Sequence, residues 1–219
     1  MIPVAQEDLT SNNCEPSKSI LDKVKQETKL LHQGMHQHPL MLNLLSHTSS
    51  VELYQCLLCA YYDLYRRIEA QLVAAIQRLN IEFDYASRTK LPWLEQDLIF
   101  FGINPARTPT LDLALSNIND LSEFIAILYV IEGSTQGGQV LAKQLQSRLG
   151  IGPESGGRFF SAYGESTAPM WENFKQFVEN SAESCDEATT IVMAKTTFLH
   201  FQQTLDHYYY AQQSLVNTD

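Results

Sequence analysis

The sequence predicts an all-α fold of about eight helices in a single domain, on three observations. Apolar residues recur at steps of three or four along most of the chain, which places them on one face of a helix. No segment shows the alternation of apolar and polar residues between hairpin turns that is typical of a strand. Finally, 219 residues are enough for one sizeable hydrophobic core.

The expected elements follow in order along the chain. Residues 1–17 are polar and contain two prolines, so we expect an N-terminal arm ahead of a helical domain at 18–215. From Ser19 onward, an amphipathic stripe predicts one helix through Leu21, Val24, Thr28, Leu31 and Met35. Pro39 predicts a turn into a short helix that carries Met41, Leu44 and Leu45.

The later helices have recognisable ends. Ser49 or Ser50 is expected to cap a long helix from Val51 to about Leu79. Pro92 suits the first turn of the next helix, and Gly102 suits its end. A further helix is expected from near Asp120. The last two are predicted over MWENFKQFVENSA and from about Glu187 to Tyr210.

Composition and charge exclude several functions. The 15 Lys and Arg against 25 Asp and Glu leave a net charge of −10, which argues against a nucleic-acid partner. An anionic ligand would therefore need a local basic patch. No apolar run reaches the about 20 residues of a membrane span, and the N-terminus does not resemble a signal peptide. Cys56 and Cys59 form a lone CxxC inside an apolar helical run, without the second pair typical of zinc sites, so we expect reduced, buried thiols and a cytoplasmic protein.

The segment ILYVIEGSTQGGQVLAKQLQ conflicts with helix propensity. Gly133, Gly137 and Gly138 lie inside it, and each costs about 1 kcal/mol relative to Ala in a helix interior. Gly133 and Gly137 share a face without side chains, which allows close approach to the backbone. Two interpretations stay open. In the first, the glycines have a structural role, either in close packing of another helix or as a joint between two helices. In the second, a bent helix lies over a flat ligand, and Ser134 supplies a polar group.

A histidine cluster precedes this segment. His32 lies on the apolar stripe, so we expect it to face the interior, whereas His36 and His38 are expected nearer the helix end and solvent. No Glu is followed by His three residues later, which excludes the Glu-x-x-His pairs of a di-iron bundle. A hydrogen-bonded core histidine remains the alternative to a ligand. Lys25 and Lys29, taken alone, are typical of a solvated helix face.

Five segments, in consistent order from about Ser19 to about Tyr210, together resemble the heme oxygenase family. VKQETKLLH is similar to its proximal helix, in which a Thr precedes the iron-ligating His by four residues. LYVIEGSTQGGQVLAKQL resembles its kinked distal helix, in a form similar to bacterial members. The other three are SRTKLPWLEQDLIFFGI, GGRFFSAYG and AKTTFLHF.

The resemblance implies a heme oxygenase-like helical bundle that holds heme between the proximal and distal helices. It implies ring opening of heme, as substrate and prosthetic group, by O2 and a reductant to biliverdin, carbon monoxide and ferrous iron. The electron donor would be a ferredoxin, a flavoprotein reductase or a small reductant, and a phytochrome would be one recipient of biliverdin. A non-catalytic heme-binding or heme-sensing protein is the main alternative. The chain resembles a thiaminase-like enzyme less. Such an enzyme needs a nucleophilic cysteine placed near acidic residues, and Cys185 lies in a polar, loop-like stretch.

The resemblance also implies residue roles. His32 would be the axial iron ligand, with Lys25, Lys29 and Lys175 near the heme propionates. Gly133, Ser134, Gly137 and Tyr65 would act at the oxygen-binding side, and further heme contacts are expected from Thr28, Tyr129, Gly138 and Phe198. The chain departs from the mammalian pattern at three positions. Ser134 and His36 replace acidic residues, and Glu179 replaces an arginine.

Overall fold

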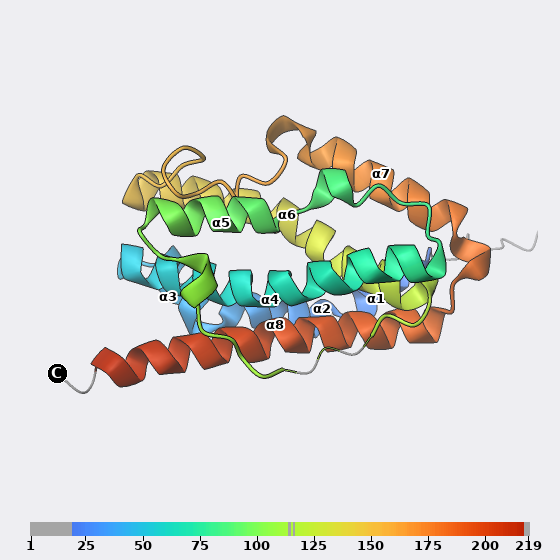
Figure 1. The fold of residues 1–219 in the computed structure, drawn as a ribbon, viewed down its shortest axis with the longest axis horizontal. Coiled ribbons are helices and arrows are strands. Elements are labelled where there is room, and N and C mark those ends of the chain that lie inside the picture. The colour runs from blue at the N-terminus through green and yellow to red at the C-terminus, as the bar shows by residue number, and fades with distance from the viewer. Residues whose placement is uncertain (1–18, 114, 116, 217–219) are drawn as a thin grey trace, which may run out of the picture.

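Eight α-helices and four short 3-10 helices, with no strand, make up the part of the chain that the computed structural model describes, residues 19–113, 115 and 117–216 (Figure 1). The expected arm at 1–17 lies outside these residues. The α-helices are α1 Ile20–Glu27, α2 Lys29–Gln37, α3 Pro39–Leu45, α4 Val51–Leu79, α5 Leu91–Phe100, α6 Leu121–Leu149, α7 Thr167–Asn180 and α8 Glu187–Val216. The all-α prediction is confirmed.

Side-chain caps explain where the longest helices begin. The Ser50 hydroxyl accepts a hydrogen bond from the Leu53 N–H at the start of α4, and the Asp120 carboxylate accepts one from the Glu123 N–H at the start of α6. Each cap satisfies a backbone donor that a helix start leaves without a partner. Helix α5 ends before Gly102, whose φ of +73° suits a residue without a Cβ.

Three long helices, α4, α6 and α8, form the centre of the bundle. In Figure 1, α8 runs along one side of the molecule, with α4 beside it and α6 passing behind α4 and α5. Helix α8 packs against α1, α2, α4 and α6, while α5 packs on α4 and α7 packs on α6. One continuous core of buried residues joins them, including Tyr54, Leu57, Phe124, Leu128 and Leu205.

The N-terminal segment was predicted to be one helix, but the structure has two helices, α1 and α2, which meet at Thr28. Thr28 has φ −97° and ψ 1°, and its hydroxyl donates to the Val24 carbonyl at 2.7 Å. A threonine that bonds back by four residues bends a helix, and this one ends α1 and starts α2. The helical bond from the His32 N–H to the Thr28 carbonyl persists at 2.9 Å, so α2 follows without a gap.

The prediction for His38 is wrong, because His38 is buried, with 4% of its surface exposed. Its Nδ1 accepts a hydrogen bond from the Leu40 N–H, which caps α3, and its Nε2 lies 3.2 Å from a carboxylate oxygen of Asp206 on α8. The short helix begun by Pro39 folds back onto α8, and this brings His38 inside. The last helix also runs to Val216, beyond the predicted end at Tyr210.

Candidate functional site

A cavity of about 1020 Å³ lies among α1, α2, α4, α6, α7 and α8. The bend segment after α6 adds Phe159 and Phe160 to its wall. The structure brings all twelve sequence-predicted site residues to this cavity. They are Lys25, Thr28, Lys29, His32, Tyr65, Tyr129, Gly133, Ser134, Gly137, Gly138, Lys175 and Phe198. Residues from six separate helices and the junction at Thr28 thus meet at one site.

His32 and His36 lie on the side of α2 that borders the cavity. Their ring centroids are 4.6 Å apart in an edge-to-face arrangement, and the Phe198 ring lies 6.0 Å from His32. Partial burial lowers the pKa of His32, and the neighbouring His36 lowers it further. The neutral imidazole, which is the form that binds a metal, is therefore favoured at neutral pH. His36 was expected nearer solvent, and it is exposed, although it also borders the cavity.

The glycine segment does not interrupt α6, which continues as one α-helix from Leu121 to Leu149. The three glycines have different surroundings. A methyl group on Gly133 would lie 3.9 Å from the Trp171 ring of α7, and one on Gly138 would lie 3.5 Å from the Phe160 carbonyl oxygen. A methyl on Gly137 would meet nothing within 4 Å. A methyl group at Gly133 or Gly138 would thus make ordinary van der Waals contact with its neighbours, whereas Gly137 leaves bare backbone facing open space.

Two hydroxyl pairs lie on the cavity wall. The Tyr65 phenol of α4 is 3.2 Å from the Ser134 hydroxyl of α6, and Ser134 donates to the Ile131 carbonyl at 2.8 Å. Burial raises the pKa of Tyr65 well above its ordinary value, so the phenol stays protonated at neutral pH. The Thr28 side chain lies close to the Tyr129 phenol, so the junction of α1 and α2 faces α6 here.

Four lysines line the cavity although the chain is acidic overall, and three of them were predicted from the sequence. Lys25 and Lys29 lie on either side of Thr28, and Lys175 lies on α7. Lys175 pairs with Glu172 at 2.7 Å, in an exposed ion pair of the kind that stabilises little. Among the residues that the structure describes, no ion pair within 4 Å involves Lys25 or Lys29. Both cations can therefore serve an anionic ligand.

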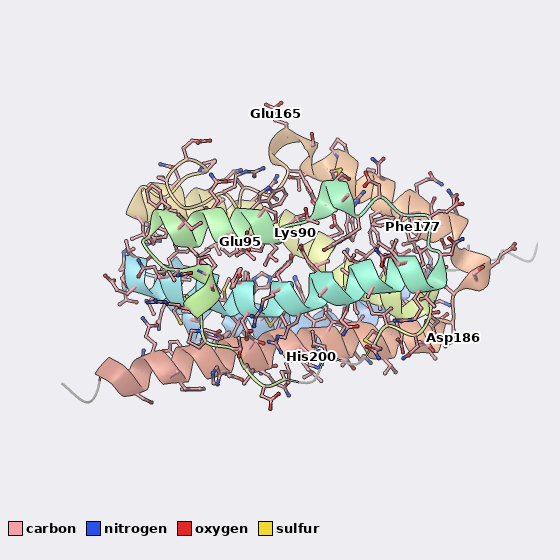
Figure 2. The ribbon with its side chains drawn as sticks, viewed as in Figure 1. Lys90, Glu95, Glu165, Phe177, Asp186 and His200 are labelled. Atoms are coloured by element: carbon pink, nitrogen blue, oxygen red, sulfur yellow. The ribbon has the colours of Figure 1, made fainter. Side chains whose placement is uncertain are left out.

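Sequence reasoning missed a buried ionic cluster at the back of this site. Lys90, labelled in Figure 2, directly precedes α5 and is buried. Lys90 lines the cavity, and its Nζ donates to Glu132 at 2.7 Å. Glu132 follows Leu128 by four residues, so its place on the apolar stripe of α6 was a readable signal that it is buried.

The cysteine pair has the buried environment expected of structural thiols. Cys56 is buried and Cys59 is half-buried on α4. Burial raises the pKa of the Cys56 thiol to about 12 and that of the Cys59 thiol to about 11. Thiolates, the reactive form, are therefore scarce at neutral pH.

The fold and the cavity define an all-helical ligand-binding domain with one large, aromatic-lined pocket rimmed by cations. No helix among the described residues is long and apolar enough to cross a membrane. The profile of the heme oxygenase family matches residues 18–207. The chain therefore belongs to the heme oxygenase family.

Individual relatives agree with this assignment. The chain is 24% identical over 197 residues to a heme oxygenase of Takifugu rubripes, covering 84% of this chain and 71% of that protein. The NO- and CO-bound heme oxygenase of Neisseria meningitidis superimposes with a TM-score of 0.70 at 20% identity, covering 88% of this chain and 93% of the other. Heme oxygenase-1 of the cyanobacterium Synechocystis in complex with heme gives a TM-score of 0.67 at 16% identity, covering 92% and 99%. These structural likenesses show the fold.

Proposed function

We propose that this protein opens the heme ring oxidatively, with O2 and a reductant, to yield biliverdin, carbon monoxide and ferrous iron. One observation carries the proposal. A histidine on α2, bare glycine backbone on α6 and three lysines from three helices all border the same cavity. A flat apolar macrocycle with one metal ion and two carboxylates requires this combination of groups.

The residues present fit heme on three counts. The cavity of about 1020 Å³ reaches the upper end of the range of about 300–1,000 Å³ typical of ligand pockets. Tyr61, Phe159, Trp171, Phe198 and Phe201 supply aromatic lining for a planar ring. His32, kept neutral by partial burial, supplies an imidazole of the kind that ligates heme iron.

Each wall has a task in this proposal. His32 binds the iron from α2, and Lys25, Lys29 and Lys175 pair with the propionates at the cavity rim. Gly137 leaves its part of the cavity wall without a side chain, so that small ligands could approach the backbone there when heme is bound. Heme, when bound, supplies the activation of dioxygen, which the protein positions and to which it delivers protons.

Proton delivery falls to the Tyr65 and Ser134 pair. Ser134 replaces the acidic residue of mammalian family members, so no carboxylate stands at this position. The Tyr65 phenol remains protonated because burial raises its pKa, and it lies 3.2 Å from the Ser134 hydroxyl. The pair can orient a cavity water and pass a proton along hydroxyl groups, without acting as a strong acid.

Hemin added to the purified protein should give a Soret band, and reductant in air should then convert it to biliverdin absorption. The reaction is run with a reduced ferredoxin, a flavoprotein reductase and ascorbate in parallel, so that a missing donor is not mistaken for inactivity. A Soret band without ring loss under all three donors would overturn the enzyme and favour a heme-binding or heme-sensing protein. No Soret band would overturn both.

A further inference from the structure

Glu132 directly precedes Gly133 in the sequence, and its carboxylate is buried behind the cavity wall. Glu132 is 1% exposed and does not line the cavity, whereas Gly133 and Ser134 do. Both carboxylate oxygens are held. Oε1 accepts from Lys90 Nζ at 2.7 Å, and Oε2 accepts from Arg88 Nη1 at 2.9 Å. The Tyr163 hydroxyl lies 3.0 and 3.1 Å from these two oxygens.

Lys90 is also fully engaged. Besides Glu132, its Nζ donates to the Arg88 carbonyl at 2.9 Å and to the Tyr163 hydroxyl at 3.0 Å. The three N–H donors of the ammonium group therefore each have an acceptor. Its side chain is 1% exposed, yet it borders the cavity. The cluster is thus a closed ionic network that forms part of the wall.

Stability alone is a poor explanation for such a network. Taking charges out of water costs several kcal/mol per ion, and well-packed apolar side chains of similar volume often stabilise a protein as well or better. Removing a single partner, in contrast, leaves an uncompensated charge and is costly. What a satisfied ionic network adds is a defined geometry among the segments that it joins.

The segments joined here are the two walls of the cavity. Arg88 Nη2 donates to the Met170 carbonyl of α7 at 3.1 Å, and Met170 directly precedes Trp171. The Trp171 ring is the group that a methyl on Gly133 would meet at 3.9 Å. A single cluster thus holds the glycine segment of α6 from behind and also fixes α7, against which that segment packs.

We propose that Glu132, with Lys90, Arg88 and Tyr163, is a positioning residue that sets the spacing between the glycine segment of α6 and Trp171 of α7, and thereby the width of the porphyrin site. The inference rests on the proposed function for the identity of the ligand. The spacing itself is a property of the ligand-free protein.

The two tryptophans of the chain make this spacing measurable without turnover. Trp93 and Trp171 both line the cavity, so their emission reports on this wall. Glu132→Gln keeps the side-chain shape and removes the charge. The matched control is Glu187→Gln, which removes a carboxylate from an exposed ion pair with Lys23.

Glu132→Gln should increase acrylamide quenching of the ligand-free protein and weaken binding of zinc protoporphyrin by about tenfold, which is about 1.4 kcal/mol. Zinc protoporphyrin is the probe because it reports binding without ring opening. The control should leave both measurements at their wild-type values. Tyr163→Phe removes one hydroxyl that contacts both Glu132 and Lys90, and it tests the same idea in a milder way if Glu132→Gln does not fold.

A lower melting temperature with wild-type quenching and wild-type porphyrin affinity would overturn the inference, because the cluster would then be purely structural. If wild-type protein binds neither hemin nor zinc protoporphyrin, the proposed function fails. The quenching comparison in the ligand-free protein then still tests the inference. Unchanged quenching in both Glu132→Gln and Tyr163→Phe would overturn it.

Discussion

The Tyr65 phenol and the Ser134 hydroxyl lie 3.2 Å apart, and this contact joins α4 to α6 directly beside Gly133. The two side chains come from positions 69 residues apart in the sequence. Burial keeps the phenol protonated by raising its pKa. The contact is therefore a neutral hydroxyl pair, and its role in the proposed reaction can be tested separately from ligand binding.

Tyr65→Phe and Ser134→Ala should each lower the rate of ring opening by about five- to tenfold, the effect of one lost hydrogen bond of about 1 kcal/mol. Hemin affinity should stay near the wild-type value. Because the two hydroxyls act as one unit, the double variant should be little slower than either single variant. Single-turnover rates measure this, and fully multiplicative effects would show that the hydroxyls act independently.

Gly137→Ala should have opposite effects on stability and on hemin binding. A methyl at Gly137 meets no atom within 4 Å, so the ligand-free protein should gain up to about 1 kcal/mol from better helix propensity. The same methyl enters the cavity and should weaken hemin binding and ring opening. Urea unfolding and hemin titration measure the two effects.

Gly34→Ala is the matched control for Gly137→Ala. Gly34 lies in α2, a methyl there also meets nothing within 4 Å, and Gly34 does not line the cavity. The Gly34→Ala variant should be stabilised about as much as Gly137→Ala, and its hemin affinity should be unchanged. Equal loss of hemin affinity in both variants would contradict the role given to Gly137.

His32→Ala should abolish ring opening and change the Soret spectrum of the hemin complex, because the proposed iron ligand is removed. Imidazole added to the solution should restore the wild-type spectrum in part, since truncation leaves room for it. His47→Ala, at an exposed position outside the cavity, is the control and should behave as wild type. Wild-type turnover in His32→Ala would remove this residue as the ligand.

Lys29→Gln should weaken hemin binding by about two- to fivefold at low salt, and by less at high salt, because an exposed ion pair with a propionate is screened. The control is Lys23→Gln. Lys23 is paired with Glu187 and lies outside the cavity lining. Hemin titrations at two ionic strengths check this, and the same loss in both variants would mean that the effect is one of general charge.

The buried carboxyl group of Asp97 should make the free energy of unfolding depend on pH. Its carboxylate accepts the Arg158 and Phe159 N–H groups, both at 2.8 Å, and so positions the Phe159 ring in the cavity wall. Burial raises its pKa from 3.8 to about 6, so between these values the folded protein binds the proton more tightly than the unfolded chain. The resulting stabilisation is present at low pH and is lost as the pH rises through about 6.

Relative to Asp97→Asn, the wild type should therefore gain free energy of unfolding on acidification from pH 7 to pH 4, by at most about 3 kcal/mol. Urea unfolding of both proteins across this range measures the difference. A difference that is constant with pH, or that grows toward pH 7, would contradict the raised pKa.

Local signals explain why much of the fold was predictable. Ser50 and Asp120 are good capping residues ahead of strongly periodic segments, and α4 ends at Leu79, as expected. The division at Thr28 was not predictable from periodicity, because Thr28 keeps its place on the apolar stripe while its hydroxyl bonds back to Val24. His38 was placed in solvent because only the docking of α3 on α8 buries it.

The candidate site was predictable where a motif carries it. His32, the glycines and the lysines were found by resemblance, and the structure brings them to one cavity. The ionic cluster was not found, because charges on separate segments acquire partners only in three dimensions. Lys90 and Glu132 are 42 residues apart, and neither lies in a recognisable charge pattern with the other.

Helix α8 has a consequence for how the protein is made. The α1–α3 side of the molecule is joined to α8 by the ion pairs Lys23–Glu187 and Glu27–Lys195 and by the hydrogen bond between His38 and Asp206. During synthesis from the N-terminus, α2 with His32 emerges before α8, the helix against which α2 packs most extensively. The nascent chain therefore cannot complete the cavity beside His32 before α8, which supplies Phe198 and Phe201 to its wall, has been synthesised.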